Sequence, residues 1–210
     1  MTASNYLNKT LWIIVVLLAI LVGLIPLNYI EQDTESGFLE LKDDTLLNSM
    51  AWQFAFNAHI ISGGIAIMIG WLQFSKKLLS KRPKWHRVIG KIYIVAALTC
   101  ALSGTYVGYF ATGGPIAAAG FITIGIIYFY TTLKAYLHIR NRQIEQHKVM
   151  MVYSYAACMA AVTLRLYVPF LTVFLGDYFI AYRIVAWVSW IPNLLLARIL
   201  SKKIANVQVL

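Results

Sequence analysis

Charged residues are scarce in this sequence, at 12% of the chain, whereas a soluble domain carries about 25%. The chain is 60% hydrophobic, and its mean hydropathy is +0.70. The few charges are clumped and leave several apolar runs of about 20 residues, long enough to cross a hydrocarbon core of about 30 Å. A soluble protein with long buried helices needs a polar face on each helix, which these runs lack. The composition therefore predicts an integral membrane protein.

Well-known catalytic motifs are also missing. No Ser-His-Asp, HExxH, Walker or GxGxxG pattern occurs, which argues against soluble-type hydrolase, zinc-protease and nucleotide chemistry. The sequence leaves open whether the chain is an enzyme. It has two cysteines, Cys100 and Cys158, and both fall inside apolar runs, where packing is the expected role rather than a disulfide.

What the sequence contains is six apolar segments, and we expect a single all-α domain, residues 1–210, built as a six-span transmembrane helical bundle. The first segment is too long for a signal peptide and is followed by no cleavage site, so we expect it to remain as an anchor. The predicted spans are residues 11–30, 51–74, 88–111, 116–137, 149–174 and 179–200.

Charge is distributed unequally between the two sides of this bundle. All basic residues except Lys42, Arg165 and Arg183 map to one side, and all acidic residues except Glu145 map to the other, mostly in the loop 31–50. The positive-inside rule then places both termini in the cytoplasm and the chain in a bacterial cytoplasmic membrane. We expect the basic loops to contact anionic lipid rather than nucleic acid. The acidic loop is expected to be solvated, or to carry a short amphipathic helix at the interface.

Small residues form a stripe on three spans, 51–74, 88–111 and 149–174, and each stripe includes a histidine. Helices in lipid associate through close packing of small residues, so we expect these three spans to form the centre of the bundle. In the span 149–174 the seam of small residues consists of Met151, Ser154, Cys158 and Ala161.

His59 and Arg165 are predicted to lie at the same depth, roughly 12 and 14 Å from the outer ends of their spans. An arginine at a helix centre costs about 2.5 to 3.5 kcal/mol on insertion, so it should face the interior and find acceptors. Since the predicted spans contain no carboxylate, a ligand phosphate, carboxylate or quinone oxygen is a candidate. Asn57 and Tyr106 are further candidates for this outer pocket. Alternatively, Arg165 snorkels outward or bonds carbonyls freed near Pro169.

His86, His138 and His147 map to the inner ends of three neighbouring spans. Three imidazoles there are candidates for a metal site or for a site of haem b. The alternative is that each is an ordinary histidine at the membrane interface. In the last span we expect Pro192 to kink the helix and the amide of Asn193 to cap a freed backbone group.

Several motifs together resemble one known group. The segments "NAHIISGGIAIMIGWLQF", "HRVIGKIYI", "QHKVMMVYSYAACMAAVTLRLYVP" and "WVSWIPNL" resemble bacterial membrane proteins grouped as domain of unknown function family 2306, over roughly residues 50–195. The resemblance implies a His in the second span, an HR-x-x-G-x-x-Y entry to the third, and an H-x-x-x-M-x-x-S-Y entry to the fifth with an Arg late in that span. At the matching positions this chain has His59; His86, Arg87, Gly90 and Tyr93; His147, Met151, Ser154 and Tyr155; and Arg165.

The family is uncharacterised, so the resemblance leaves the function open. The chain departs from it at Arg198, where the family pattern implies an acidic residue. A weaker resemblance is to cytochrome b type bundles, in which histidines hold haem. Two haems need histidine pairs at two depths, and His59 is alone at the outer level, so the sequence is compatible with one haem or none.

Three functions remain open. The first is a membrane redox protein that binds haem or quinone. The second is a transporter or binding protein for a small anion, a lipid head group or a proton. The third is a non-catalytic subunit that contacts a membrane partner, or another copy of itself, through the acidic outer loop. A metal-dependent hydrolase built on the inner histidines is a lesser alternative.

Overall fold

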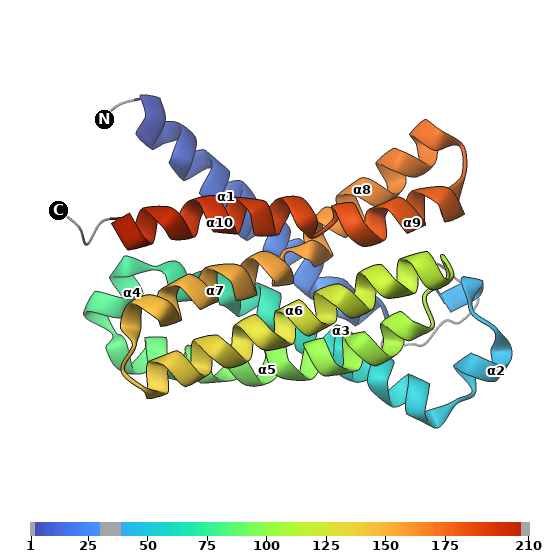
Figure 1. Ribbon diagram of the computed structural model, residues 1–210, viewed down its shortest axis with the longest axis horizontal. Helices are drawn as coiled ribbons and strands as arrows, with labels where there is room; N and C mark the ends of the chain where they lie inside the picture. The colour runs from blue at the N-terminus through green and yellow to red at the C-terminus, as the bar shows by residue number, and fades with distance from the viewer. Residues whose placement is uncertain (1–2, 30–38, 207–210) are drawn as a thin grey trace.

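The computed structural model describes residues 3–29 and 39–206, which contain helices and no strands (Figure 1). Six helical segments are long and apolar enough to cross a membrane, which confirms the predicted all-α, six-span architecture. The third and fifth begin about a turn earlier than predicted, and the other boundaries agree within a few residues. The observed segments are Thr10–Leu27, Met50–Phe74, Pro83–Tyr109, Pro115–Arg140, Ile144–Leu175 and Tyr178–Lys202.

The first two spans are joined by a segment with short helices. Leu39, in the first of these, is buried against Trp52 and Phe56, so the described part of the outer loop packs on the bundle. This half of the chain consists of α1 Ala3–Leu24, the 3-10 helices η1 Ile25–Tyr29 and η2 Leu39–Leu41, α2 Asp44–Leu47, α3 Met50–Gly70 and η3 Trp71–Phe74.

The remaining spans follow a short connecting helix, α4. Proline begins α5 and α6, a position where its missing N–H costs nothing. The side chain of Asp177 caps α9 by accepting the backbone N–H of Ile180 at 2.9 Å. The elements are α4 Lys76–Lys81, α5 Pro83–Tyr109, α6 Pro115–Arg140, α7 Ile144–Cys158, α8 Ala160–Leu175, α9 Tyr178–Val188 and α10 Ile191–Asn206.

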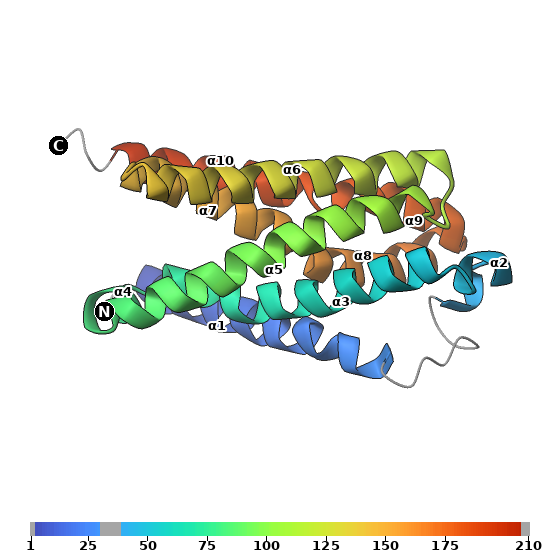
Figure 2. The ribbon, with the colours of Figure 1, turned by 90° about the horizontal axis from the view of Figure 1, so that it is seen from below.

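The bundle is built on neighbouring pairs: α1 packs on α3, α3 on α5, α5 on α6, α6 on α7, and α7 on α10. Figure 2 shows α5 crossing between α3 and α6. We expected spans two, three and five to form the centre, and α6 of span four proves equally central because it packs along both α5 and α7. Both ends of the described chain lie at the same end of the bundle as α4 and the α6–α7 turn (Figure 1). We call this the basic end.

Spans five and six are each broken into two helices. The first break is at Met159 and the second is at Ser189 and Trp190, just before Pro192, as the sequence predicts. At the second break the side-chain amide of Asn193 donates to the Ser189 carbonyl at 3.1 Å and to the Thr163 hydroxyl at 3.2 Å. Beyond these breaks α8 and α9 form a hairpin that diverges from α7 and α10 (Figure 1).

Candidate functional site

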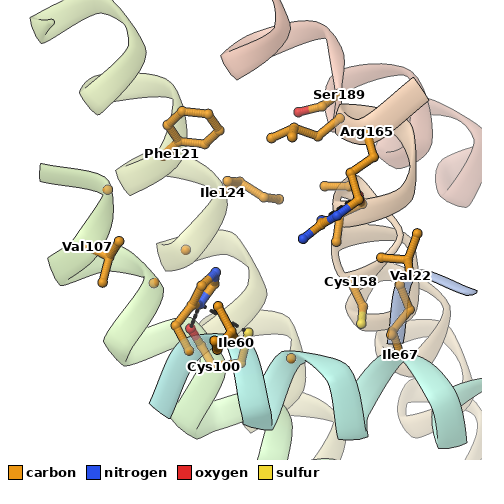
Figure 3. A pocket seen from close by; sticks show the side chains of 18 of the residues that line it. Val22, Ile60, Ile67, Cys100, Val107, Phe121, Ile124, Cys158, Arg165 and Ser189 are labelled. Atoms are coloured by element: carbon orange, nitrogen blue, oxygen red, sulfur yellow. Dashed lines mark hydrogen bonds between the residues drawn. The ribbon is translucent and has the colours of Figure 1, made fainter. Parts of the chain in front are cut away.

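A cavity of about 480 Å³ lies where the α8–α9 hairpin faces α3, α5 and α6 (Figure 3). Its wall is mostly apolar and includes several glycines, which allow the helix backbones to approach the space directly. Residues of α1, of η1 and of the C-terminal end of α7 complete the wall. Two of the predicted site residues, His59 and Arg165, line this one cavity.

His59 projects from α3 and is fixed by α5. Its Nδ1 lies 3.0 Å from the carbonyl oxygen of Cys100, so Nδ1 carries the proton and Nε2 is left as an acceptor. The Cys100 sulfur lies 3.4 Å from the same nitrogen. A Cβ added at Gly104 would lie 2.6 Å from two atoms of the His59 ring, so the glycine provides the space that the imidazole occupies.

Arg165 projects from α8, and its guanidinium extends into the cavity (Figure 3). Nη1 donates to the Ala161 carbonyl of its own helix at 2.9 Å. The residue is exposed and lines the cavity. A guanidinium has five N–H donors, so donors remain for another molecule. None of the described residues that line the cavity is acidic.

Four tyrosines also line the cavity, and no sequence pattern had marked them as ligand-binding residues. Tyr178 and Tyr182 lie one turn apart on α9 with their rings stacked at 5.5 Å. Tyr29 comes from η1 and Tyr128 from α6. The Tyr128 hydroxyl is buried and has no hydrogen-bond partner among the described residues. A spacing of four residues could have marked Tyr178 and Tyr182 as neighbours, but not as cavity residues.

Two predicted members of the outer pocket lie elsewhere. Asn57 lines a separate hollow of about 40 Å³ beside Trp52 and Phe56. Tyr106 is 42% exposed and packs edge-on against Phe110 with ring centroids 5.4 Å apart. Neither side chain is among those that line the cavity.

The inner histidines lie at the basic end and make local contacts. His138 Nδ1 lies 2.6 Å from Gln143 Oε1, and His147 Nδ1 donates to the Ala135 carbonyl at 2.8 Å. His86 Nδ1 is buried without a partner in the described part of the chain. No group of three or more His, Cys, Asp or Glu side chains within the described ranges is placed to hold a metal ion. The haem and metal hypotheses for these residues stay predictions.

The supporting residues have mixed positions. Arg87 is exposed and donates from Nε to the Pro83 carbonyl at 3.4 Å. Tyr93 and Ser154 are fully buried, with their hydroxyl oxygens 2.8 Å apart. Tyr155 donates to the Ile67 carbonyl at 3.2 Å, and Asn193 lies at the break in span six. Apart from Arg87, these side chains join helices inside the bundle.

Comparison with known families gives one result. The model of the family described as predicted membrane protein (DUF2306) matches residues 56–201. The chain belongs to this family. The match includes His59, Arg165 and all three inner histidines, and it confirms the resemblance seen in the sequence motifs. No curated protein and no solved structure matches the chain. Family and spans together make it a multi-pass membrane protein.

Proposed function

We propose that this protein binds an amphipathic, lipid-soluble molecule of the quinone class in the cavity. The observation that carries the proposal is that Arg165 and His59 line one apolar cavity. Its volume of about 480 Å³ lies within the range of about 300 to 1,000 Å³ that is usual for small-molecule sites. An apolar wall with a few convergent polar groups suits a ligand that has an apolar body and a polar head.

The two polar groups complement both redox forms of a quinone. The Arg165 guanidinium is a donor to a carbonyl oxygen, and its hydrogen bond strengthens if that oxygen becomes anionic. His59 Nε2 is an acceptor, because Nδ1 is engaged by the Cys100 carbonyl, and it suits the hydroxyl of a quinol. A ligand oxygen also offsets the cost of placing an arginine at this depth.

A lipid head group with an anionic oxygen is the second candidate, supported by the same guanidinium. A small hydrophilic anion is less favoured because the cavity wall is mostly apolar. We further propose that the basic end faces the cytoplasm of a bacterial cell, where its lysines and arginines lie against anionic lipid. In this orientation the cavity lies in the outer half of the membrane.

Lipid analysis of the purified protein tests the proposal. Organic extraction and mass spectrometry should find up to one quinone per chain in the wild type. Arg165→Gln should reduce it roughly tenfold or more, since a hydrogen bond to a charged group is worth about 1.5 to 3 kcal/mol. His59→Gln removes a neutral hydrogen bond worth about 0.5 to 1.5 kcal/mol and should reduce it roughly two- to tenfold. Tyr106→Phe is the matched control because this exposed residue lies outside the cavity. Thermal unfolding of each variant verifies that it is folded.

Added short-chain quinone provides a second measurement. Decylubiquinone, or a short-chain menaquinone analogue, should raise the unfolding temperature of the wild type and of Tyr106→Phe but not that of Arg165→Gln. A protein that carries no quinone and shows no shift with either compound contradicts the proposal. Phospholipid or fatty acid lost selectively from Arg165→Gln would favour the second candidate. An absorption spectrum and metal analysis of the same sample test the haem and metal hypotheses.

A further inference from the structure

A row of buried hydroxyl groups runs through the helix core next to the cavity. The Tyr93 hydroxyl on α5 lies 2.8 Å from Ser154 Oγ on α7, which lies 2.7 Å from Thr132 Oγ1 on α6. All three residues are 0% exposed. Each hydroxyl both donates and accepts hydrogen bonds, and its hydrogen rotates to suit its neighbours. The row can therefore be polarised in either direction.

Tyr128 connects this row to the cavity. It lines the cavity wall, it is 6% exposed, and its hydroxyl has no partner among the described residues. The polar side chains nearest to it in the core are those of Tyr93 and Cys158. A buried hydroxyl without a partner carries a desolvation cost of about 1 to 3 kcal/mol. A ligand in the cavity, or a small movement toward Tyr93, would satisfy it.

The other end of the row points toward the basic end of the bundle. The helices α5 and α7 both begin there (Figure 1). His147 lies seven residues before Ser154 on α7, about 10.5 Å along the axis. Its Nδ1 donates to the carbonyl of Ala135, which is one turn beyond Thr132 on α6. His147 is partly exposed, so it is a titratable group close to the basic surface, with His86 and His138 near it.

Met151 lies between His147 and Ser154 along α7. It lies on the same face of α7 and is 6% exposed. A methionine side chain is unbranched and adaptable, so its movement can open a space next to the row for water. In this structure the hydrogen-bonded row runs from Tyr93 to Thr132, and a gap separates it from Tyr128 on the cavity side and from His147 on the basic side.

We infer that Tyr128, Tyr93, Ser154 and Thr132 form a proton path between the cavity and His147. Each oxygen accepts a proton from one neighbour and releases its own to the next, so the number of O–H bonds is unchanged. Water admitted beside Met151 links Thr132 with the imidazole. The destination of the proton rests on the proposed function, because a quinone takes up protons when it is reduced.

Proton flux into vesicles tests the path. Purified protein is reconstituted with a pH-sensitive dye trapped inside, and a potassium diffusion potential with valinomycin drives proton entry. Tyr93→Phe and Thr132→Val should each slow the flux roughly tenfold or more, because each removes one proton carrier. Thr132→Ser, which restores the hydroxyl, should keep it, and Met151→Ala should raise it.

Two matched controls separate proton transfer from packing. Tyr155 is buried beside Ser154 but donates to the Ile67 carbonyl, and Thr131 is buried beside Thr132 but bonds to its own helix backbone. Tyr155→Phe and Thr131→Val should therefore leave the flux unchanged. If the path variants and the control variants have equal flux, the hydroxyls serve packing alone and the inference is wrong.

The inference would also be overturned if vesicles with the wild-type protein showed no greater proton flux than empty vesicles, both with and without decylubiquinone. The quinone content of the same preparations keeps the two proposals separate. Tyr93→Phe should lose proton flux and retain quinone, whereas Arg165→Gln should lose quinone. Flux that depends on Tyr93 and Thr132 in a protein without any quinone would support the path and reject the proposed ligand.

Discussion

The imidazole of His59 lies 3.0 Å, through Nδ1, from the carbonyl oxygen of Cys100. This contact joins α3 to α5 across the wall of the cavity. It fixes the ring and its tautomer together, since a carbonyl accepts and does not donate. The remaining nitrogen, Nε2, therefore keeps its lone pair. In an apolar enclosure that nitrogen is a specific acceptor for a hydroxyl of the ligand.

Enlarging Gly104 should displace this imidazole. A Cβ at position 104 would lie 2.6 Å from ring atoms of His59, and the branches of valine need more room still. Gly104→Val should thus lower quinone content roughly as His59→Gln does, while the helices still form. Ser103→Ala on the same helix is the control, because the Ser103 hydroxyl bonds to its own helix backbone. Equal quinone content in both variants would show that the ring position is unimportant.

Lys42 should react with acylating reagents at lower pH than an ordinary lysine. Partial burial lowers the pKa of its amine to about 8, although Asp43 raises it, and the amine donates to the Phe110 carbonyl. A solvated lysine, with a pKa of about 10.4, is almost fully charged at pH 8. Mass spectrometry of acetylation between pH 6 and 10 should give Lys42 a rate midpoint near 8.

The sign of the accompanying stability change follows from the same shift. The pKa of Lys42 is lower in the folded chain than its usual 10.5, so the folded state binds fewer protons between about pH 8 and 10.5. The contribution of this residue to stability therefore rises with pH across that window. Below the window the amine is charged in both the folded and the unfolded chain, and the contribution is constant. Lys42→Gln should remove this pH dependence. A wild-type free energy of unfolding that falls as the pH rises across this window would contradict the lowered pKa of Lys42.

The outer pocket illustrates what the sequence can and cannot predict. Counting residues along two spans places His59 and Arg165 at one depth, and both line the cavity, because helical rise is constant. Asn57 and Tyr106 were chosen by depth alone. Asn57 is two residues from His59 and Tyr106 is two residues from Gly104, which turns each about 200° around its helix. Depth along the helix axis was considered without the angular position around it, so both chosen side chains point away from the cavity.

The cavity itself depends on long-range geometry that hydropathy does not encode. The six spans follow from length and composition, and the break before Pro192 follows from its missing N–H. The break at Met159 has no proline or glycine to mark it, and Pro169 lies inside the continuous α8. The two breaks together direct the hairpin of α8 and α9, which brings Tyr178 and Tyr182 to the cavity. No local pattern predicts that direction.

The Asn193 amide should stabilise the break in span six. It donates to the Ser189 carbonyl at 3.1 Å and the Thr163 hydroxyl at 3.2 Å. Asn193→Ala should lower stability by about 0.6 kcal/mol, the average for hydrogen bonds between membrane helices, and by no more than about 1.7 kcal/mol. Thr123→Ala is a suitable control, since the exposed Thr123 hydroxyl bonds only to its own helix at 2.7 Å. Thermal unfolding in detergent measures both, and equal unfolding temperatures would argue against a role of the amide.

Orientation in the membrane can be measured with introduced cysteines. Ser80 in α4 and Thr45 in α2 are exposed at opposite ends of the bundle. If the basic end faces the cytoplasm, an impermeant maleimide added to intact spheroplasts should label Thr45→Cys at once. Ser80→Cys should be labelled only after the membrane is permeabilised. Labelling in the reverse order would mean that the basic end faces the outside of the cell.

Both cysteines of the chain, Cys100 and Cys158, are buried, and both line the cavity. The native protein thus carries two thiols for footprinting at its ligand space and none elsewhere. Buried thiols in apolar surroundings react slowly, and a bound molecule should slow a small permeant alkylating reagent further. The mass of the intact protein then reports occupancy directly. Compounds of any chemical class can be screened in native membranes in this way, without a label and without a mutation.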